Sequence, residues 1–206
     1  MRNGFVLAFC AVLAFSGSVF AQDTEEDWNA KALALRAQGK PEEAIAAFDK
    51  AIAASPKLAP MALVNKGALL RGLGKYDDAM QAFDKALELD PNHPHAWYDK
   101  GVLLWQRGDP KAALKAFDMT IKLRPDEALP WLNRSVVLIE VGQAEAALQS
   151  IDKGLALNAD LDGAWYIKGV ILRTLGHQQE AIAAFGKWSE LLCDRFSKEH
   201  DALPMK

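Results

Sequence analysis

A repeat of thirty-four residues constrains this chain more than any other feature of its sequence. Five glycines recur at nearly constant spacing: Gly39, Gly74, Gly108, Gly142 and Gly176. Alanines, large apolar residues and mainly aromatic residues form three further series with the same spacing. Their members are Ala44, Ala79, Ala113, Ala147 and Ala181; Phe48, Phe83, Phe117, Ile151 and Phe185; and Trp28, Leu63, Trp97, Trp131 and Trp165. Several series with one period indicate one structural unit copied along the chain.

Each unit predicts two helices joined by a tight turn. In the third unit, small or apolar residues recur at i, i+4 and i+7 on both sides of Gly108, which places each set on one helix face. The glycine breaks the first helix, and Pro110 suits the first turn of the second. Prolines also end the second helices of the first three units, at Pro56, Pro91 and Pro125.

These residues resemble the tetratricopeptide repeat, whose pattern runs Trp, Leu-Gly, an aromatic residue, Ala-x3-Phe, Ala and Pro. The segments 79–91, AMQAFDKALELDP, and 97–125 match it closely. In that register the units are 25–58, 60–93, 94–127, 128–161 and 162–195, with Ala59 as a one-residue insertion. The sequence departs from the family pattern in the last two units. Ser135 replaces a glycine, Ala159 and Cys193 replace prolines, and Trp188 replaces a small residue.

The resemblance implies an all-α fold, an α-solenoid of five antiparallel helix pairs in a right-handed superhelix, with the first helices on the concave side. Residues 22–206 then form a single domain without an internal boundary, and residues 196–206 are its tail. Small residues such as Gly67 and Gly101 allow close helix approach. Apolar residues continue past the fifth unit at helical spacing, which predicts a capping helix to about Lys198 or, through Trp188 or Phe196, self-association.

Residues 1–21 read as an export signal. Arg2 precedes an apolar stretch, 5–15, a polar Ser-Gly-Ser segment follows, and Val19 and Ala21 suit the pocket of a signal peptidase. We expect cleavage after Ala21 and a periplasmic or secreted protein. The alternative is an uncleaved membrane anchor, although the apolar stretch is shorter than the ~20 residues that span a bilayer. Cys10 follows a bulky Phe inside this stretch, which disfavours lipid attachment.

Composition excludes one large class of function. The chain has 206 residues, with 24 Lys and Arg against 27 Asp and Glu and a net charge of −3, so it lacks the excess of cations that a nucleic-acid-coating protein needs. Cys10 and Cys193 are its two cysteines, and loss of the leader leaves one thiol and no intrachain disulfide. We expect Cys193 to be a part-buried packing residue, with an intermolecular disulfide as the alternative.

The resemblance also implies a partner-binding groove on the concave side. In this family ligands contact first-helix positions, which here form an apolar band in units three to five, with Leu129 on the same face. The band and its polar member comprise Tyr98, Val102, Trp105, Leu132, Asn133, Val136, Ile139, Tyr166 and Val170, and the arginines Arg36, Arg71 and Arg173 stand at the rim. Such a groove suits an amphipathic helix or an extended apolar peptide. The alternative is that some of these side chains only pack between adjacent first helices.

One family mechanism does not fit. The clamp for the acidic tails of cytosolic chaperones uses Lys and Asn in one unit, Asn in the next, and Lys and Arg in the third. The matching positions here are Asn29, Leu33, Asn65, His95 and Asp99. Only Asn65 fits, and Asp99 would repel a carboxylate.

Patterns that carry catalysis or cofactor binding are incomplete. The segment 72–75, GLGK, lacks the spacing and the Ser or Thr of a phosphate loop. His93 and His95 flank a proline in a turn without further metal ligands at suitable spacing, and we expect them to be solvent-exposed. Cys193 and His200 are about two helical turns apart, too far for a nucleophile and its base. We therefore expect no enzyme activity, no cofactor and no metal.

The sequence thus predicts a non-catalytic scaffold of the cell envelope that binds a protein or peptide in its concave groove. One alternative is a structural subunit of an obligate homo- or hetero-oligomer, including a homodimer through the C-terminal helix. A remote alternative is a nucleotide-dependent or catalytic factor. Repeats of this kind bind many different partners, so the sequence does not identify the partner.

Overall fold

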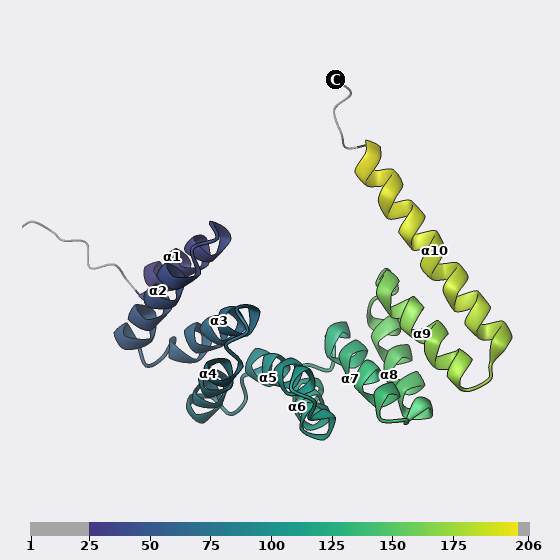
Figure 1. Ribbon diagram of the computed structural model, residues 1–206, viewed down its shortest axis with the longest axis horizontal. Coiled ribbons are helices and arrows are strands. Elements are labelled where there is room, and N and C mark those ends of the chain that lie inside the picture. The colour runs from purple at the N-terminus through teal and green to yellow at the C-terminus, as the bar shows by residue number, and fades with distance from the viewer. Residues whose placement is uncertain (1–24, 202–206) are drawn as a thin grey trace, which may run out of the picture.

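The computed structural model describes residues 25–201, which form ten α-helices in five antiparallel pairs (Figure 1). The first helices are α1 (Glu25–Ala37), α3 (Ala59–Gly72), α5 (Pro94–Gln106), α7 (Ala128–Glu140) and α9 (Asp162–Thr174). The second helices are α2 (Pro41–Ala54), α4 (Tyr76–Leu89), α6 (Pro110–Leu123), α8 (Ala144–Leu157) and α10 (Gln178–Asp201). The predicted all-α solenoid is confirmed. The leader, 1–21, and the end of the tail lie outside the described residues.

The glycine series forms the turns inside the pairs. All five glycines have positive φ, between 73° and 81°. At the end of α1, the N–H of Gly39 donates to the carbonyl of Arg36 and the N–H of Lys40 donates to that of Leu35, both at 3.0 Å. This bonding satisfies the last carbonyls of the helix and requires a left-handed residue, which glycine adopts without steric cost. The period of the sequence repeat is therefore the period of these turns.

The core of each pair is one large side chain set against a small one. Phe83 is fully buried, and a Cβ built on Gly67 would lie 2.5 Å from its ring. In the same way, a Cβ built on Gly101 would lie 2.9 Å from the ring of Phe117. In the fourth unit both members differ, because Ser135 occupies the glycine position and Ile151 replaces the ring. The smaller Ile151 leaves room for Ser135, and both are fully buried, so this departure keeps the packing intact.

The first helices line the inner side of the curve. Besides its own partner, α5 contacts both α3 and α7, and α7 also contacts α9. Neighbouring second helices do not make comparable contacts in the part of the chain that the structure describes. The first helices are therefore closer together than the second ones, and the stack bends around them, as Figure 1 shows.

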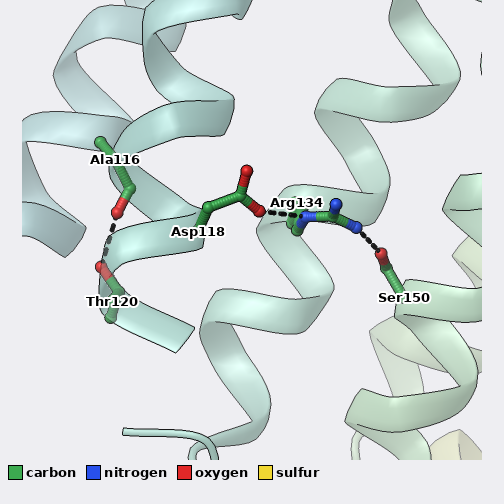
Figure 2. Close-up of polar contacts among 5 residues, drawn as sticks. All are labelled: Ala116, Asp118, Thr120, Arg134 and Ser150. Atoms are coloured by element: carbon green, nitrogen blue, oxygen red, sulfur yellow. Dashed lines mark hydrogen bonds and ion pairs between the residues drawn. The ribbon is translucent and has the colours of Figure 1, made fainter. Parts of the chain in front are cut away.

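Equivalent ion pairs tie each repeat to the next. In each, a cation near the middle of a first helix binds an aspartate on the preceding second helix, with N···O distances of 2.5 to 2.8 Å. The pairs are Lys66 with Asp49, Lys100 with Asp84, Arg134 with Asp118, and Lys168 with Asp152. At the third junction the guanidinium of Arg134 also donates to the hydroxyl of Ser150, so that it joins α6, α7 and α8 (Figure 2). Nearby, the Thr120 hydroxyl donates to the Ala116 carbonyl.

Tryptophans fix the turns between repeats. The indole N–H of Trp97 donates to the carbonyl of Pro91 at 2.8 Å, and Trp131 bonds Pro125 in the same way. Trp165 donates to the carbonyl of Ala159 at 2.8 Å. Because the acceptor is a backbone carbonyl, Ala159 can accept this hydrogen bond as well as a proline can. The turn after the fourth unit is therefore held in the same way as the turns before it.

The last helix continues to Asp201, slightly beyond the predicted end, and no proline interrupts it. Arg195 near its C-terminal end forms a 2.9 Å ion pair with Asp162 at the start of α9. Cys193 is exposed, so the prediction of a part-buried packing residue was wrong. The reason is that Cys193 lies about 160° around α10 from Arg195, which contacts α9. No helix of the described part is long and apolar enough to cross a membrane.

Candidate partner-binding groove

The inner face of α5, α7 and α9 brings the predicted apolar band together. Tyr98, Val102 and Trp105 come from α5, and the next four members come from α7: Leu132, Asn133, Val136 and Ile139. Tyr166 and Val170 come from α9. All of these side chains are partly buried except Tyr166, which is 47% exposed. The band therefore spans three consecutive repeats along the inner side of the stack.

Several members of the band also contact the core. Tyr98, Val102 and Trp105 pack against a buried cluster that includes Phe117 and Val137. Leu132 and Ile139 pack against the cluster around Ile151. The alternative stated above, packing between helices, thus accounts for one side of these residues. Their remaining exposed surface lies along one face, where an apolar ligand could contact it.

Hydrogen bonds link the band from one repeat to the next. The Asn133 amide donates to the Tyr98 hydroxyl at 2.8 Å, and the Trp105 indole donates to the Glu140 carboxylate at 2.6 Å. Each bond joins α5 to α7, and thus one repeat to its neighbour. They hold the two aromatic side chains in fixed orientations, which lowers the entropy lost when a ligand binds. Burial raises the pKa of the Tyr98 hydroxyl, which keeps the hydroxyl protonated.

Arg71 has an intramolecular partner. Its guanidinium lies 3.5 Å from a carboxylate oxygen of Asp99, one repeat further along the inner face. Burial raises the pKa of Asp99, and the neighbouring Arg71 charge opposes that shift. Among the described residues, the buried Nε atom of Arg71 has no hydrogen-bond partner. Arg71 therefore forms part of the groove wall, whereas the repeat pattern predicts it at the rim as a contact for an acidic partner.

The other two arginines are exposed and come from the two ends of the stack. Arg36 is an exposed side chain in the last turn of α1, and Arg173 is an exposed side chain in the last turn of α9. The guanidinium carbon of Arg173 lies 6.0 Å from the centre of the Phe185 ring on α10. The structure thus does not gather the three arginines into one cationic cluster.

Aromatic residues of α9 and α10 close the C-terminal end of the band. The Tyr166 ring centre lies 5.7 Å from that of Phe185 and 5.2 Å from that of Trp188, with tilted planes. Trp188 takes the place of a small residue in the family pattern and provides this contact. The fifth unit therefore has an aromatic contact that the small residue of the family pattern could not make.

Polar residues of the first three repeats bond to one another or to the backbone. The Asn65 amide donates to Asn29 at 3.3 Å, which joins α1 to α3. His93 is not an exposed turn residue as expected, because its Nδ1 accepts the Ala96 N–H at 3.3 Å and caps α5. Burial lowers the pKa of His93, which favours the neutral imidazole that can accept this bond. In the described ranges no three His, Cys, Asp or Glu side chains are placed to hold a metal ion.

A surface depression of about 680 Å³ lies between the second helices α6 and α8, over Trp131 and Arg134 of α7. It is lined mainly by second helices, whereas the band is formed by first helices.

Comparisons with known families decide the classification. Models of the tetratricopeptide repeat match residues 29–94, 64–128 and 162–188, which together cover more than half of the chain. The chain belongs to the tetratricopeptide repeat family. Proteins of this family are typically non-catalytic scaffolds for protein interactions. No curated protein matches this tetratricopeptide repeat protein.

Solved structures share its fold. A MamA fragment, 41-end, from Desulfovibrio magneticus RS-1 superposes with a TM-score of 0.73 at 25% identity, covering 84% of this chain and 97% of its own. YrrB is described as a TPR protein with an unusual peptide-binding site. It superposes with a TM-score of 0.67 at 21% identity, covering 87% of this chain and 92% of its own. The thermophilic TPR protein TTC0263 of Thermus thermophilus superposes with a TM-score of 0.64 at 21% identity, covering 82% of this chain and 91% of its own. These likenesses confirm the solenoid fold of this tetratricopeptide repeat protein.

Proposed function

We propose that this protein is a non-catalytic adaptor that binds an apolar peptide or an amphipathic helix along the inner face of α5, α7 and α9. The observation that carries the proposal is the continuity of the band over three repeats. Contiguous apolar surface of this kind on one face of a protein commonly marks an interaction site. YrrB, which has a similar fold, is described as having a peptide-binding site, and this supports the proposal that the present chain binds a peptide.

The contacts in the band favour a ligand with apolar side chains. Tyr98 and Trp105 are oriented by Asn133 and Glu140, so they offer rigid aromatic surfaces. Rigid aromatic side chains contribute much of the binding energy at protein interfaces, because little conformational entropy is lost when they are covered. Val102 lies between them in the sequence of α5, and Val136 and Val170 occupy the equivalent positions of α7 and α9.

A selection of peptides on the purified protein tests this proposal. We expect a random peptide library to yield apolar binders, and we expect these binders to lose affinity when charges are placed on the inner face. Leu129→Lys combined with Tyr166→Lys is suitable, because these side chains are 51% and 47% exposed and their replacement leaves the core intact. The expected loss of affinity is at least about tenfold.

Two exposed leucines of the second helices provide the matched control. Leu89 is 51% exposed and Leu157 is 44% exposed, and they end α4 and α8 respectively. The variant Leu89→Lys with Leu157→Lys adds the same charge and removes the same kind of surface away from the inner face. Equal affinity of the selected peptides for both double variants would refute binding in the groove.

We also propose that the protein works in the cell envelope after export. Three features of the leader support cleavage by a signal peptidase: Arg2, the apolar stretch 5–15, and the small residues Val19 and Ala21. Fractionation of cells followed by N-terminal sequencing tests this. The expected product is a periplasmic or secreted chain that begins at Gln22. A chain that retains Met1 in the membrane fraction would instead support the anchored form.

The remote nucleotide-dependent alternative has a simple test. A thermal-shift screen with nucleotides measures whether any of them stabilises the fold, since a ligand that binds only the native state raises the melting temperature. We expect no shift at millimolar nucleotide. A reproducible increase in melting temperature would contradict the non-catalytic assignment.

A further inference from the structure

In the first four repeats, one face of each second helix is covered by the following repeat. On α2 this face carries Ile45, Asp49 and Ile52: the two isoleucines pack against the core of the second repeat, and Asp49 binds Lys66 of α3. The same register recurs in the next three repeats. The equivalent residues are Met80, Asp84 and Leu87; Leu114, Asp118 and Ile121; and Leu148, Asp152 and Leu155.

On α10 the corresponding face is exposed. Its residues at that register are Ile182, Gly186 and Ser189, and the longer helix adds Cys193 and Phe196 at the same helical spacing. We call these five residues the α10 seam. Ile182 is 63% exposed and Phe196 is 60% exposed, the highest values among the exposed large hydrophobic side chains of the described residues. The seam thus extends the interface that joins the repeats, but no repeat of the described chain covers it.

The seam does not suit another repeat of the same kind. Gly186 occupies the position at which the first four repeats carry the aspartate of the inter-repeat ion pair. Ser189 occupies the position of an isoleucine or leucine. A first helix with a lysine at the usual place would therefore meet neither its counter-charge nor an apolar contact. Head-to-tail stacking of chains is disfavoured for the same reason.

The seam is self-complementary instead. Its large residues stand at the two ends and its three small residues lie between them, with Ser189 at the centre. The alternating spacing of four and three positions is that of a coiled-coil seam. If a second copy runs antiparallel, Ile182 meets Phe196 of the other copy, Gly186 meets Cys193, and Ser189 meets Ser189. Small residues at the centre allow the backbones to approach closely, and no charged residue lies in the seam.

We propose that the protein forms a two-fold symmetric homodimer through antiparallel contact of the two α10 seams. A two-fold axis through Ser189 makes both partners use one surface, which closes the assembly at two chains. The dimer is independent of the groove, which lies on the inner side of the stack. It would present two grooves to a partner, so that a bivalent partner binds with higher avidity than either groove alone provides.

Mass measurements across a range of protein concentrations test the proposal. We expect light scattering to approach the mass of two chains, and we expect Ile182→Glu to weaken dimerisation by about tenfold or more, since it buries a charge opposite Phe196. Ala183→Glu adds the same charge to an exposed position about 100° around the helix and should leave the dimer unchanged. Both sites are exposed, so equal melting temperatures of the diluted variants would show that the fold is intact. A single-chain mass throughout, equal effects of the two variants, or growth beyond two chains would each overturn the proposal.

Cross-linking tests the antiparallel register. In a Cys10→Ser, Cys193→Ser background, Ser189→Cys places one thiol on the proposed axis, and a copper–phenanthroline oxidant removes two electrons and two protons to form the disulfide. We expect rapid formation of cross-linked dimers, because thiols at the axis come within disulfide reach. Asp194→Cys is the matched control, since Asp194 is exposed and lies about 140° around the helix from Ser189. Equally rapid cross-linking of the control would refute the proposed register.

Discussion

The pairing of small and large residues inside each unit predicts a strong coupling between two positions. In the second unit a Cβ on Gly67 would lie 2.5 Å from Phe83 Cε1, well inside the ~3.5–4.0 Å of a favourable carbon contact. In the fourth unit the same two positions hold Ser135 and Ile151. We therefore expect Gly67→Ser to be destabilising by itself and to be tolerated when Phe83→Ile accompanies it.

The expected size follows from two opposing effects. Overpacking of a well-filled core costs about 1–3 kcal/mol, and serine is the better helix former by about 0.5 kcal/mol. Gly67→Ser should therefore lower the free energy of unfolding by about 0.5–2.5 kcal/mol. Phe83→Ile alone leaves a cavity and should cost less than the ~3–5 kcal/mol typical of Phe→Ala. The double variant should be more stable than the sum of the two single effects by about 1 kcal/mol or more.

Urea denaturation followed by far-UV circular dichroism measures these free energies. The control is Gly163→Ser in the first turn of α9, because a Cβ there meets no atom within 4 Å. We expect that control to change stability by no more than about 0.5 kcal/mol. Additive effects of Gly67→Ser and Phe83→Ile would refute the view that the two positions are matched.

Three further predictions concern the turns, a helix cap and the ion pairs. Gly108→Ala should lower the free energy of unfolding by about 1–2 kcal/mol, because Gly108 has a φ of 78° and alanine is strained in that conformation. Calorimetric melting of the variant and the wild type measures this difference. Burial lowers the pKa of His93, so the unfolded chain binds a proton first and stability should fall as the pH drops below about 6.5. His93→Asn keeps an N-cap acceptor without titrating, and melting curves between pH 7.5 and 5 should show a smaller fall than wild type; an unchanged fall would contradict the role of His93. Asp84→Asn removes the ion pair with Lys100, which is part-exposed, and should cost about 0–1 kcal/mol, an effect that decreases with added salt in urea titrations.

The sequence was sufficient to predict the repeat and the form of its unit. The glycine series predicts the turns because a left-handed residue is needed at one place in every pair, and Gly39 and Gly108 adopt that conformation. The phenylalanine series predicts the core for a similar reason, since the rings of Phe83, Phe117 and Phe185 fill the space beside Gly67, Gly101 and Gly169, which have no side chain. Both features depend on contacts inside one unit, where the sequence interval fixes the geometry.

Contacts between units were not predicted. Asp49 and Asp84 bind Lys66 and Lys100 of the following repeats, and the pattern within a single unit does not indicate these ion pairs. The signal that could have revealed them is an aspartate on each second helix followed, at nearly constant spacing, by a cation on the next first helix. Its meaning depends on the angle between successive pairs, which the period alone does not give.

The position of the apolar band was predicted in part. Family resemblance indicated which positions face inward, and the structure places the band on the inner side of the three later units. The extent of exposure depends on the curvature of the stack, and so do the partners that Tyr98 and Trp105 find in the next repeat. The contact of Arg71 with Asp99 was not predicted for the same reason, because it joins two repeats.

The most direct test of the proposed function is an NMR titration of the methyl-labelled protein with a peptide obtained by selection. The proposal predicts that the methyl signals of inner-face residues, above all Val136 and Val170, shift in proportion to peptide bound. Under the same conditions, the exposed methyls of Leu89 and Leu157 on the second helices should keep their positions. Shifts confined to the second helices, with Val136 and Val170 unchanged, would contradict it.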